Sequence, residues 1–354
     1  LLAGRYELYD VALSQPAVNI VVANDSVANY NLVASSPGDT VKNELPFLSI
    51  NRFLLLNSGP LKYFSLPDST EFALCFSAID ANGADSPIYS MAAEGNVRIA
   101  GLPIATDGPL LFTADGRIEW NPETPSELAL KSFVLSVDGT PAKLDTRVRF
   151  DECLTIEHLE VELPSVDVTR VSGYLPEEAL ADVGNFDTNM NIAVSFKLSR
   201  PYMVLPDTVL LPSGVADLKI NPCRLSLEKI GLSLDRLSFG AQMTVDGDNL
   251  DMSVLEVNEF KMKSRVLDLD FVGSLKHPLT DPVFAGQLKG RAFIGYLPQA
   301  VKDAMGGSMR GTLGTDLSVR LRRSDLAANR FHRIFARGTV SLRQFDMAMS
   351  SDSV

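Results

Sequence analysis

Residues 189–198, "NMNIAVSFKL", decide the fold class of this chain. Every second residue is apolar, from Met190 to Leu198, and most of the residues between them are polar. An alternation with a period of two is typical of a β-strand that has one dry face and one wet face. The stretch therefore predicts a half-buried strand, and further copies of the pattern predict an antiparallel sheet.

The same alternation recurs in residues 144–150, 237–245 and 313–321. In residues 154–163 and 225–239 it slips by one position, which predicts a β-bulge or a sharp bend within a continuing strand. Helix signals are few. Residues 176–183 and 298–305 each begin with Pro and end just before Gly, so each predicts a short helix. The predicted fold is mainly β: an elongated, curved antiparallel sheet, shaped like a groove, with a few short helices.

An internal repeat accompanies the two predicted helices. The motif Gly-Tyr-Leu-Pro occurs at Gly173–Pro176 and again at Gly295–Pro298, and both copies continue into a Gly turn and a long alternating strand. A supersecondary unit copied along a chain predicts units that stack side by side. We therefore divide the chain into a β-rich N-terminal segment, residues 1–165, and a segment of repeated strand units, residues 166–354, that forms one continuous groove.

Composition limits the possible functions. Of the 354 residues, 45% are hydrophobic and 21% are charged, which is enough apolar material for a large core or a large cavity. The net charge of −12 argues against a general nucleic-acid binder, because such a protein needs a dominant basic surface. We expect no nucleic-acid partner.

The sequence offers no catalytic or metal-binding constellation. Its three cysteines, Cys75, Cys153 and Cys223, are far apart and form no Cys-x-x-Cys pair, so we interpret them as buried free thiols. Its three histidines are scattered, and it contains no nucleophile elbow, Walker loop or dinucleotide fingerprint. We therefore expect no enzyme activity, no metal and no cofactor.

Basic residues gather toward the end of the chain. Residues 291–354 contain ten Lys and Arg against five Asp, although the whole chain is acidic. We interpret these dispersed charges as an ordinary solvated face. Contact with anionic lipid headgroups is the alternative.

Three stretches resemble one known family. The first runs through Leu13 and Pro16 to the strand 18–22 and the turn Asn29-Tyr30. The second is "FLSINRFLLLNSGPLKYFSLPDSTEFALCFSAID", residues 47–80, and the third is "GSLKHPLTDPVFAGQLKGRAFIGYLP", residues 273–298, with a turn at Asp281-Pro282. Together they resemble the AsmA-like family, although Tyr30 stands where that family usually has Trp.

The resemblance implies a periplasmic protein of a Gram-negative bacterium, anchored in the inner membrane by an N-terminal helix that these residues do not include. Since residue 1 is Leu and the alternation is already under way there, we expect the chain to be part of a longer protein. Members of the family, with the TamB-like proteins, are associated with outer-membrane homeostasis and phospholipid movement between membranes. The resemblance brings no catalytic residues.

The predicted helices are too few and too short to cover the apolar faces of the strands. Two arrangements could keep these faces from water. Either two sheets pack into a closed sandwich, which would suit a structural or assembly factor for outer-membrane proteins, or acyl chains occupy an open groove. The resemblance favours the groove, with phospholipid or another acyl-chain lipid, the inner membrane and outer-membrane proteins as partners. The residues predicted to line it are Val18, Ile20, Val22, Ile192, Val194, Phe196, Phe239, Met243, Leu269 and Phe271.

Overall fold

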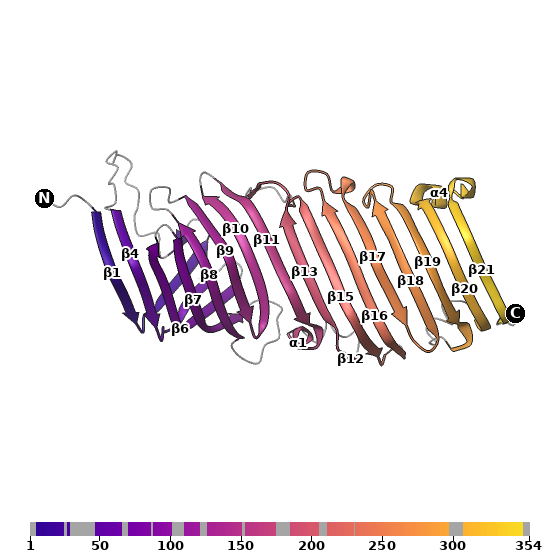
Figure 1. Cartoon of the computed structure of the whole chain (residues 1–354), viewed down its shortest axis with the longest axis horizontal. Helices are drawn as coiled ribbons and strands as arrows, with labels where there is room; N and C mark the ends of the chain where they lie inside the picture. The colour runs from indigo at the N-terminus through magenta and orange to yellow at the C-terminus, as the bar shows by residue number, and fades with distance from the viewer. Residues whose placement is uncertain are drawn as a thin grey trace. The chain divides into compact units, whose positions relative to one another are not determined.

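The computed structural model confirms the mainly β class (Figure 1). It describes residues 5–24, 27–28, 47–65, 70–85, 88–100, 110–120, 126–150, 153–174, 185–204, 211–229, 231–296 and 307–349. The chain divides into two compact units. The N-terminal unit comprises Leu1–Val161, Tyr174–Pro176 and Met203–Leu205, and the C-terminal unit comprises Glu162–Gly173, Glu177–Tyr202 and Pro206–Val354.

The N-terminal unit combines an antiparallel meander with two parallel strand pairs. Strands β6 to β10 pair in sequence order, each antiparallel to the next, as predicted. Strand β1 instead runs parallel to β4, and β2 runs parallel to β5. The strands are β1 (Arg5–Ser14), β2 (Val18–Asn24), β3 (Val27–Ala28), β4 (Phe47–Leu56), β5 (Leu61–Ser65), β6 (Thr70–Asp85), β7 (Ile88–Ala100), β8 (Leu110–Trp120), β9 (Glu127–Val137) and β10 (Thr140–Phe150).

The parallel pairs arise because two chain segments turn the same corner side by side. Gln15 follows β1 and Asn57 follows β4, and both have a positive φ, which bends an extended chain sharply. The backbone N–H of Gln15 donates to the carbonyl of Leu56, which ties the two corners together. Sequence alternation predicts strands but not their direction, so the expectation of an antiparallel sheet is wrong for these two pairs.

The C-terminal unit is an antiparallel meander. Strand β13 pairs with β15, and from β15 to β21 each strand pairs with the next one in sequence. The boundaries between the units fall within β11 (Leu154–Asp167) and within β14, of which Met203 and Val204 belong to the N-terminal unit. The other strands are β12 (Phe186–Thr188), β13 (Asn191–Leu198), β14 (Tyr202–Val204), β15 (Gly214–Leu227), β16 (Leu232–Val245), β17 (Val254–Lys263), β18 (Leu267–Lys276), β19 (Val283–Phe293), β20 (Gly307–Arg322) and β21 (Phe335–Met349).

Helices are short wherever the structure describes the chain. They are α1 (Val168–Ser172), α4 (Arg323–Ala327) and the single 3-10 turns η1 (Leu250–Met252), η2 (Ile294–Tyr296) and η3 (Phe331–Arg333). The helices predicted at residues 176–183 and 298–305 lie outside the described residues. Short helices at strand ends cannot cover the faces of the sheet.

Bulges bend the C-terminal meander. The strand register shifts between Ile220 and Leu225 of β15, and also between Val257 and Phe260 of β17, where the extra residue alters the pairing with both β16 and β18. Each extra residue increases the local twist and bend of its strand. The predicted slip in residues 225–239 is a different feature: β15 ends at Leu227 and a hairpin turn with Gly231 at positive φ leads into β16. The slip predicted in residues 154–163 lies inside β11, which runs without interruption.

The packed cores are small. In the N-terminal unit, Ala93, Ala114 and Phe133 form a buried cluster. Phe133 packs directly over Gly116, where an added Cβ would lie 2.6 Å from its ring. The three cysteines are free, as expected, but only Cys223 is buried, and this burial raises the pKa of its thiol.

Candidate functional site

The C-terminal unit brings the apolar residues of eight strands onto one face. Residues that pair across neighbouring strands share a face of a sheet, so each pairing register traces a row across it. One row is Ile192, Ile220, Phe239, Phe260, Phe271, Leu288 and Leu317. The next is Val194, Leu218, Ala241, Val257, Gly273, Gly286, Val319 and Ala336. A third is Phe196, Ala216, Met243, Leu255, Leu275, Phe284 and Leu321.

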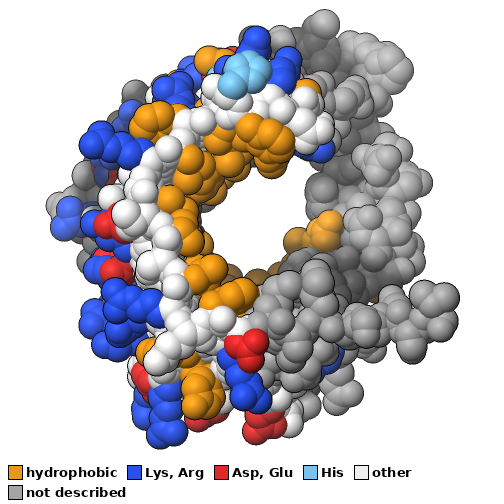
Figure 2. Space-filling view, turned by 90° about the vertical axis from the view of Figure 1, so that its right-hand side faces the viewer, with side chains coloured by type: hydrophobic (Ala, Val, Ile, Leu, Met, Phe, Trp, Pro, Cys, Tyr) orange, Lys and Arg blue, Asp and Glu red, His pale blue; other side chains and the backbone are white. Residues whose placement is uncertain are grey.

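These rows line the concave side of the unit. Figure 2 shows hydrophobic side chains along the described wall of the hollow and charged side chains on the outer side of that wall. Large side chains of the rows, such as Phe239 and Phe271, are only half-buried. Leu218 is 37% exposed and Met243 is 38% exposed. The described strands all belong to a single sheet, and the described residues include no second sheet to cover this face.

The opposite, convex face is polar. Glu259 accepts a hydrogen bond of 2.6 Å from the Ser238 hydroxyl, and this bond, helped by nearby cations, lowers the pKa of Glu259. Lys289 pairs with Asp316 across β19 and β20 at 3.5 Å. A shallow hollow on this face is lined largely by charged and hydroxyl side chains of this kind. We interpret the convex face as a solvated surface, because its charges pair with each other.

A flat floor of glycine and phenylalanine lies within the apolar face. Gly273 and Gly286 pair directly across β18 and β19. An added Cβ at Gly273 would lie 2.6 Å from the Phe271 ring, and one at Gly286 would lie 2.8 Å from the same ring. The rings of Phe271 and Phe284 stack at 5.7 Å with an interplanar angle of 9°. The two glycines therefore leave the space in which the rings lie flat against the sheet.

Seven of the ten predicted lining residues meet on this face: Ile192, Val194, Phe196, Phe239, Met243, Leu269 and Phe271. The other three, Val18, Ile20 and Val22, lie together on β2 in the N-terminal unit. Val18 is 47% exposed and Ile20 is half-buried. The prediction thus identifies two separate sets of residues, one in each unit.

Sequence reasoning missed Phe260, Phe284 and the two floor glycines. In β17 the apolar positions are Leu255 and Val257 and then, after a register shift, Phe260. That bulge hides Phe260 from a search for strict alternation. A usable signal was present in the repeated pattern Phe-x-Gly, at Phe271-x-Gly273 and again at Phe284-x-Gly286.

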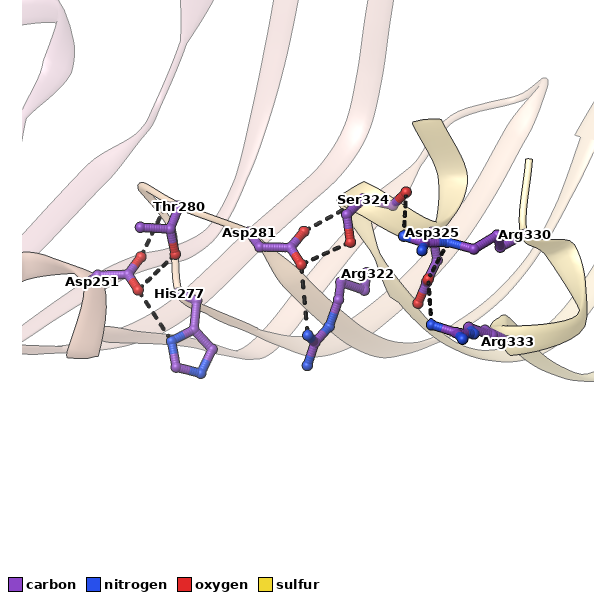
Figure 3. Close-up of polar contacts among 9 residues, drawn as sticks. All are labelled: Asp251, His277, Thr280, Asp281, Arg322, Ser324, Asp325, Arg330 and Arg333. Carbon is purple, nitrogen blue, oxygen red and sulfur yellow. Dashed lines mark hydrogen bonds and ion pairs between the residues drawn. The ribbon is translucent and has the colours of Figure 1, made fainter. Parts of the chain in front are cut away.

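One rim of the C-terminal unit carries a chain of polar contacts between successive strand connections (Figure 3). Asp251, in η1, accepts hydrogen bonds from the Thr280 backbone N–H at 3.0 Å and from the Thr280 hydroxyl at 2.8 Å. Asp281 accepts from the backbone N–H of Ser324 at 2.9 Å and from its hydroxyl at 2.8 Å. These bonds fasten the β16–β17, β18–β19 and β20–β21 connections to one another.

The same rim continues in both directions. Before η1, Ser213 accepts a hydrogen bond of 2.9 Å from the Gly247 N–H, and Arg200 pairs with Asp248. Beyond Ser324, the buried carboxylate of Asp325 pairs with Arg330 at 2.9 Å and with Arg333 at 3.7 Å. We call this set the aspartate rim. It links neighbouring strand connections along one edge of the C-terminal unit.

We expect the aspartate rim to weaken in acid. Backbone hydrogen bonds, from Thr280 to Asp251 and from Ser324 to Asp281, hold the pKa of each carboxyl below its usual value. A carboxyl whose pKa is lower in the folded state stabilises the fold above its unfolded value of about 3.9, and this contribution is lost as pH falls through the lower folded value.

Thermal unfolding measured between about pH 5 and about pH 2 tests this, because that window spans the unfolded pKa. The double variant Asp251→Asn/Asp281→Asn should be less stable than the wild type at the higher pH. It should also lose less of its melting temperature on acidification. Parallel pH profiles for the two proteins would contradict the assignment.

No family model, curated protein or solved structure matches this chain. The described part of the chain contains no helix long and apolar enough to cross a membrane. It also contains no group of three or more His, Cys, Asp or Glu residues placed to hold a metal ion.

Proposed function

We propose that this chain binds lipid acyl chains along the concave face of its C-terminal unit and carries phospholipid between membranes. One observation carries the proposal: eight paired strands place continuous rows of apolar, half-exposed side chains on one hollow face. Soluble proteins rarely leave more than a few hundred Å² of contiguous apolar surface in water.

An acyl chain suits this surface physically. Each CH₂ group that leaves water contributes about 0.8 kcal/mol, so a fatty chain lying on the rows gains free energy along its whole length. Apolar contacts are not directional. A bound chain therefore meets similar surroundings at each successive strand, which permits movement along the rows. A catalytic role has no comparable support, so we propose a carrier and not an enzyme.

The resemblance to the AsmA-like family suggests where in the cell this lipid transfer takes place. On that basis we propose that the protein works in the periplasm, anchored in the inner membrane through a segment outside this sequence. Its cargo would be phospholipid moving between the inner and outer membranes. The proposal requires no cofactor, because transfer along an apolar surface breaks no covalent bond.

The proposal predicts that the purified protein retains lipid. Native mass spectrometry should show adducts with phospholipid masses, and organic extraction of the same sample should release these phospholipids. Delipidated protein mixed with vesicles should take up lipid again. If the preparation yields no lipid and takes none up, the concave face is not an acyl-chain site.

A further inference from the structure

The connection between β20 and β21 combines exposed apolar side chains with an excess of arginine. It contains α4 and η3 and lies at the rim, beyond the strand ends, in Figure 1. Leu326 is 49% exposed and Phe331 is 61% exposed. Leu279, in the neighbouring connection that Asp281 fastens to Ser324, is 65% exposed. Three large apolar side chains thus face solvent at one end of the aspartate rim.

The charge of this connection, taken together with the adjoining ends of β20 and β21, is predominantly positive. Residues 320–337, which we call the arginine patch, contain six arginines and a single acid, Asp325, in a chain whose net charge is −12. Asp325 is buried and pairs with Arg330 and Arg333. The carboxylate of Asp325 is therefore shielded from solvent, whereas the side chains of Arg323 and Arg337 are exposed. No acid among the described residues pairs with either of these two arginines.

We propose that the arginine patch docks on the surface of an anionic lipid bilayer. Protein sites that bind the membrane interface typically combine cationic side chains with exposed aliphatic and aromatic side chains. Arginine attracts the anionic headgroups, and the apolar side chains enter the boundary between the headgroups and the acyl chains. Charge complementarity selects this occupant. A nucleic acid would leave the exposed apolar side chains of Leu326 and Phe331 in water, whereas a bilayer offers them an apolar environment.

The local structure suits shallow insertion. Hydrogen bonds from Ser324 to Asp281 hold the start of α4, and the pairs of Asp325 with Arg330 and Arg333 close the loop onto the helix. The apolar tips are therefore held in place before contact, so docking orders few additional side chains. This surface is separate from the concave face, and the inference does not require that the concave face binds lipid.

Vesicle flotation of the full chain tests the inference. The probes are vesicles of phosphatidylcholine alone and vesicles of phosphatidylcholine mixed with phosphatidylglycerol. The protein should bind the mixed vesicles at least about tenfold more strongly, and added salt should reduce this binding because screening weakens surface attraction. No binding to either vesicle would overturn the proposal, as would tighter binding to a DNA duplex or to an acidic peptide.

Two variants and one control locate the contact. Arg323→Glu/Arg337→Glu should weaken binding to the mixed vesicles by about 25-fold or more, since each arginine near an anionic surface is worth about fivefold. Leu326→Ser/Phe331→Ser should weaken it by about tenfold or more. The control is Arg265→Glu, an exposed arginine in the β17–β18 turn on the opposite rim, and it should change binding less than twofold.

Circular dichroism and thermal unfolding must show that each variant folds. Equal losses in Arg265→Glu and Arg323→Glu/Arg337→Glu would overturn the assignment to the patch. Extracted lipid, measured on the same proteins, separates this inference from the proposed function. Patch variants should keep their bound lipid, and a variant of the concave face such as Met243→Glu should keep its vesicle binding.

Discussion

Replacing Met243 with Glu should remove bound lipid without unfolding the protein. Met243 lies on the concave face and is 38% exposed, so a carboxylate there can be hydrated when no lipid is present. A bound acyl chain would strip that water, and leaving a carboxylate unpaired in an apolar environment costs several kcal/mol. We expect lipid occupancy to fall at least about tenfold, while the free energy of unfolding changes by less than about 1.5 kcal/mol.

The next residue supplies a matched control. Thr244 is exposed and pairs with Val215 and Val254, so it lies on the opposite face of the same strand. Thr244→Glu adds the same charge one position away and should keep lipid occupancy near the wild-type level. The measurements are extracted lipid per protein and the denaturation midpoint of each variant.

Val194→Glu extends the test to a deeper position in the same face. Val194 is half-buried, so this carboxylate should cost more stability than the one at Met243, but the fold should survive. Equal lipid occupancy in Met243→Glu and Thr244→Glu would mean that the concave face is not the site. If both Met243→Glu and Val194→Glu unfold the protein, the face is a packed core instead.

The sequence predicted this face because alternation along a strand places every second side chain on the same face of the sheet. If Asn191 and Ser195 face solvent, the residues that alternate with them must lie on the opposite face of the strand. These residues are Ile192, Val194 and Phe196. The strands predicted at residues 144–150, 237–245 and 313–321 lie within strands of the structure, and the one predicted at 189–198 matches β13 except for its first two residues. Local pattern is sufficient wherever a strand runs without a bulge.

Features that depend on partner strands could not be predicted in this way. The parallel pairing of β1 with β4 depends on two corners more than 40 residues apart in sequence, at Gln15 and Asn57. The opposition of Gly273 and Gly286 depends on the register of β18 against β19. The aspartate rim joins residues from several strand connections, and acids in turns resemble ordinary solvated residues until their hydrogen-bond donors are known.

The glycine and phenylalanine floor sets the depth of the concave face, and Gly286→Ala should raise that floor. The added Cβ would lie 2.8 Å from the Phe271 ring, 2.9 Å from the Val272 carbonyl oxygen and 3.1 Å from the Phe284 ring. Since the backbone can yield little, the rings have to tilt up into the hollow. Overpacking of this kind typically costs about 1–3 kcal/mol. We expect lower stability together with a clear loss of bound lipid.

Gly240→Ala is the matched control for this loss. Gly240 lies in β16, pairs with Lys219 and Glu259 on the polar face, and an added Cβ there meets nothing closer than 3.8 Å. Its lipid occupancy should stay at the wild-type level, with stability unchanged within about 0.5 kcal/mol. Equal lipid loss in Gly240→Ala and Gly286→Ala would show that a glycine in any strand of this unit matters, and not the floor in particular.

The double variant Gly286→Ala/Phe271→Ala separates obstruction from general damage. Removing the Phe271 ring leaves space for the new methyl group, so the hollow regains its depth although the protein loses apolar contacts and remains less stable than the wild type. Bound lipid should therefore recover while the denaturation midpoint does not. A double variant that binds no more lipid than Gly286→Ala would show that the ring is not the obstruction, and that the glycine pair supports the sheet and does not shape the groove.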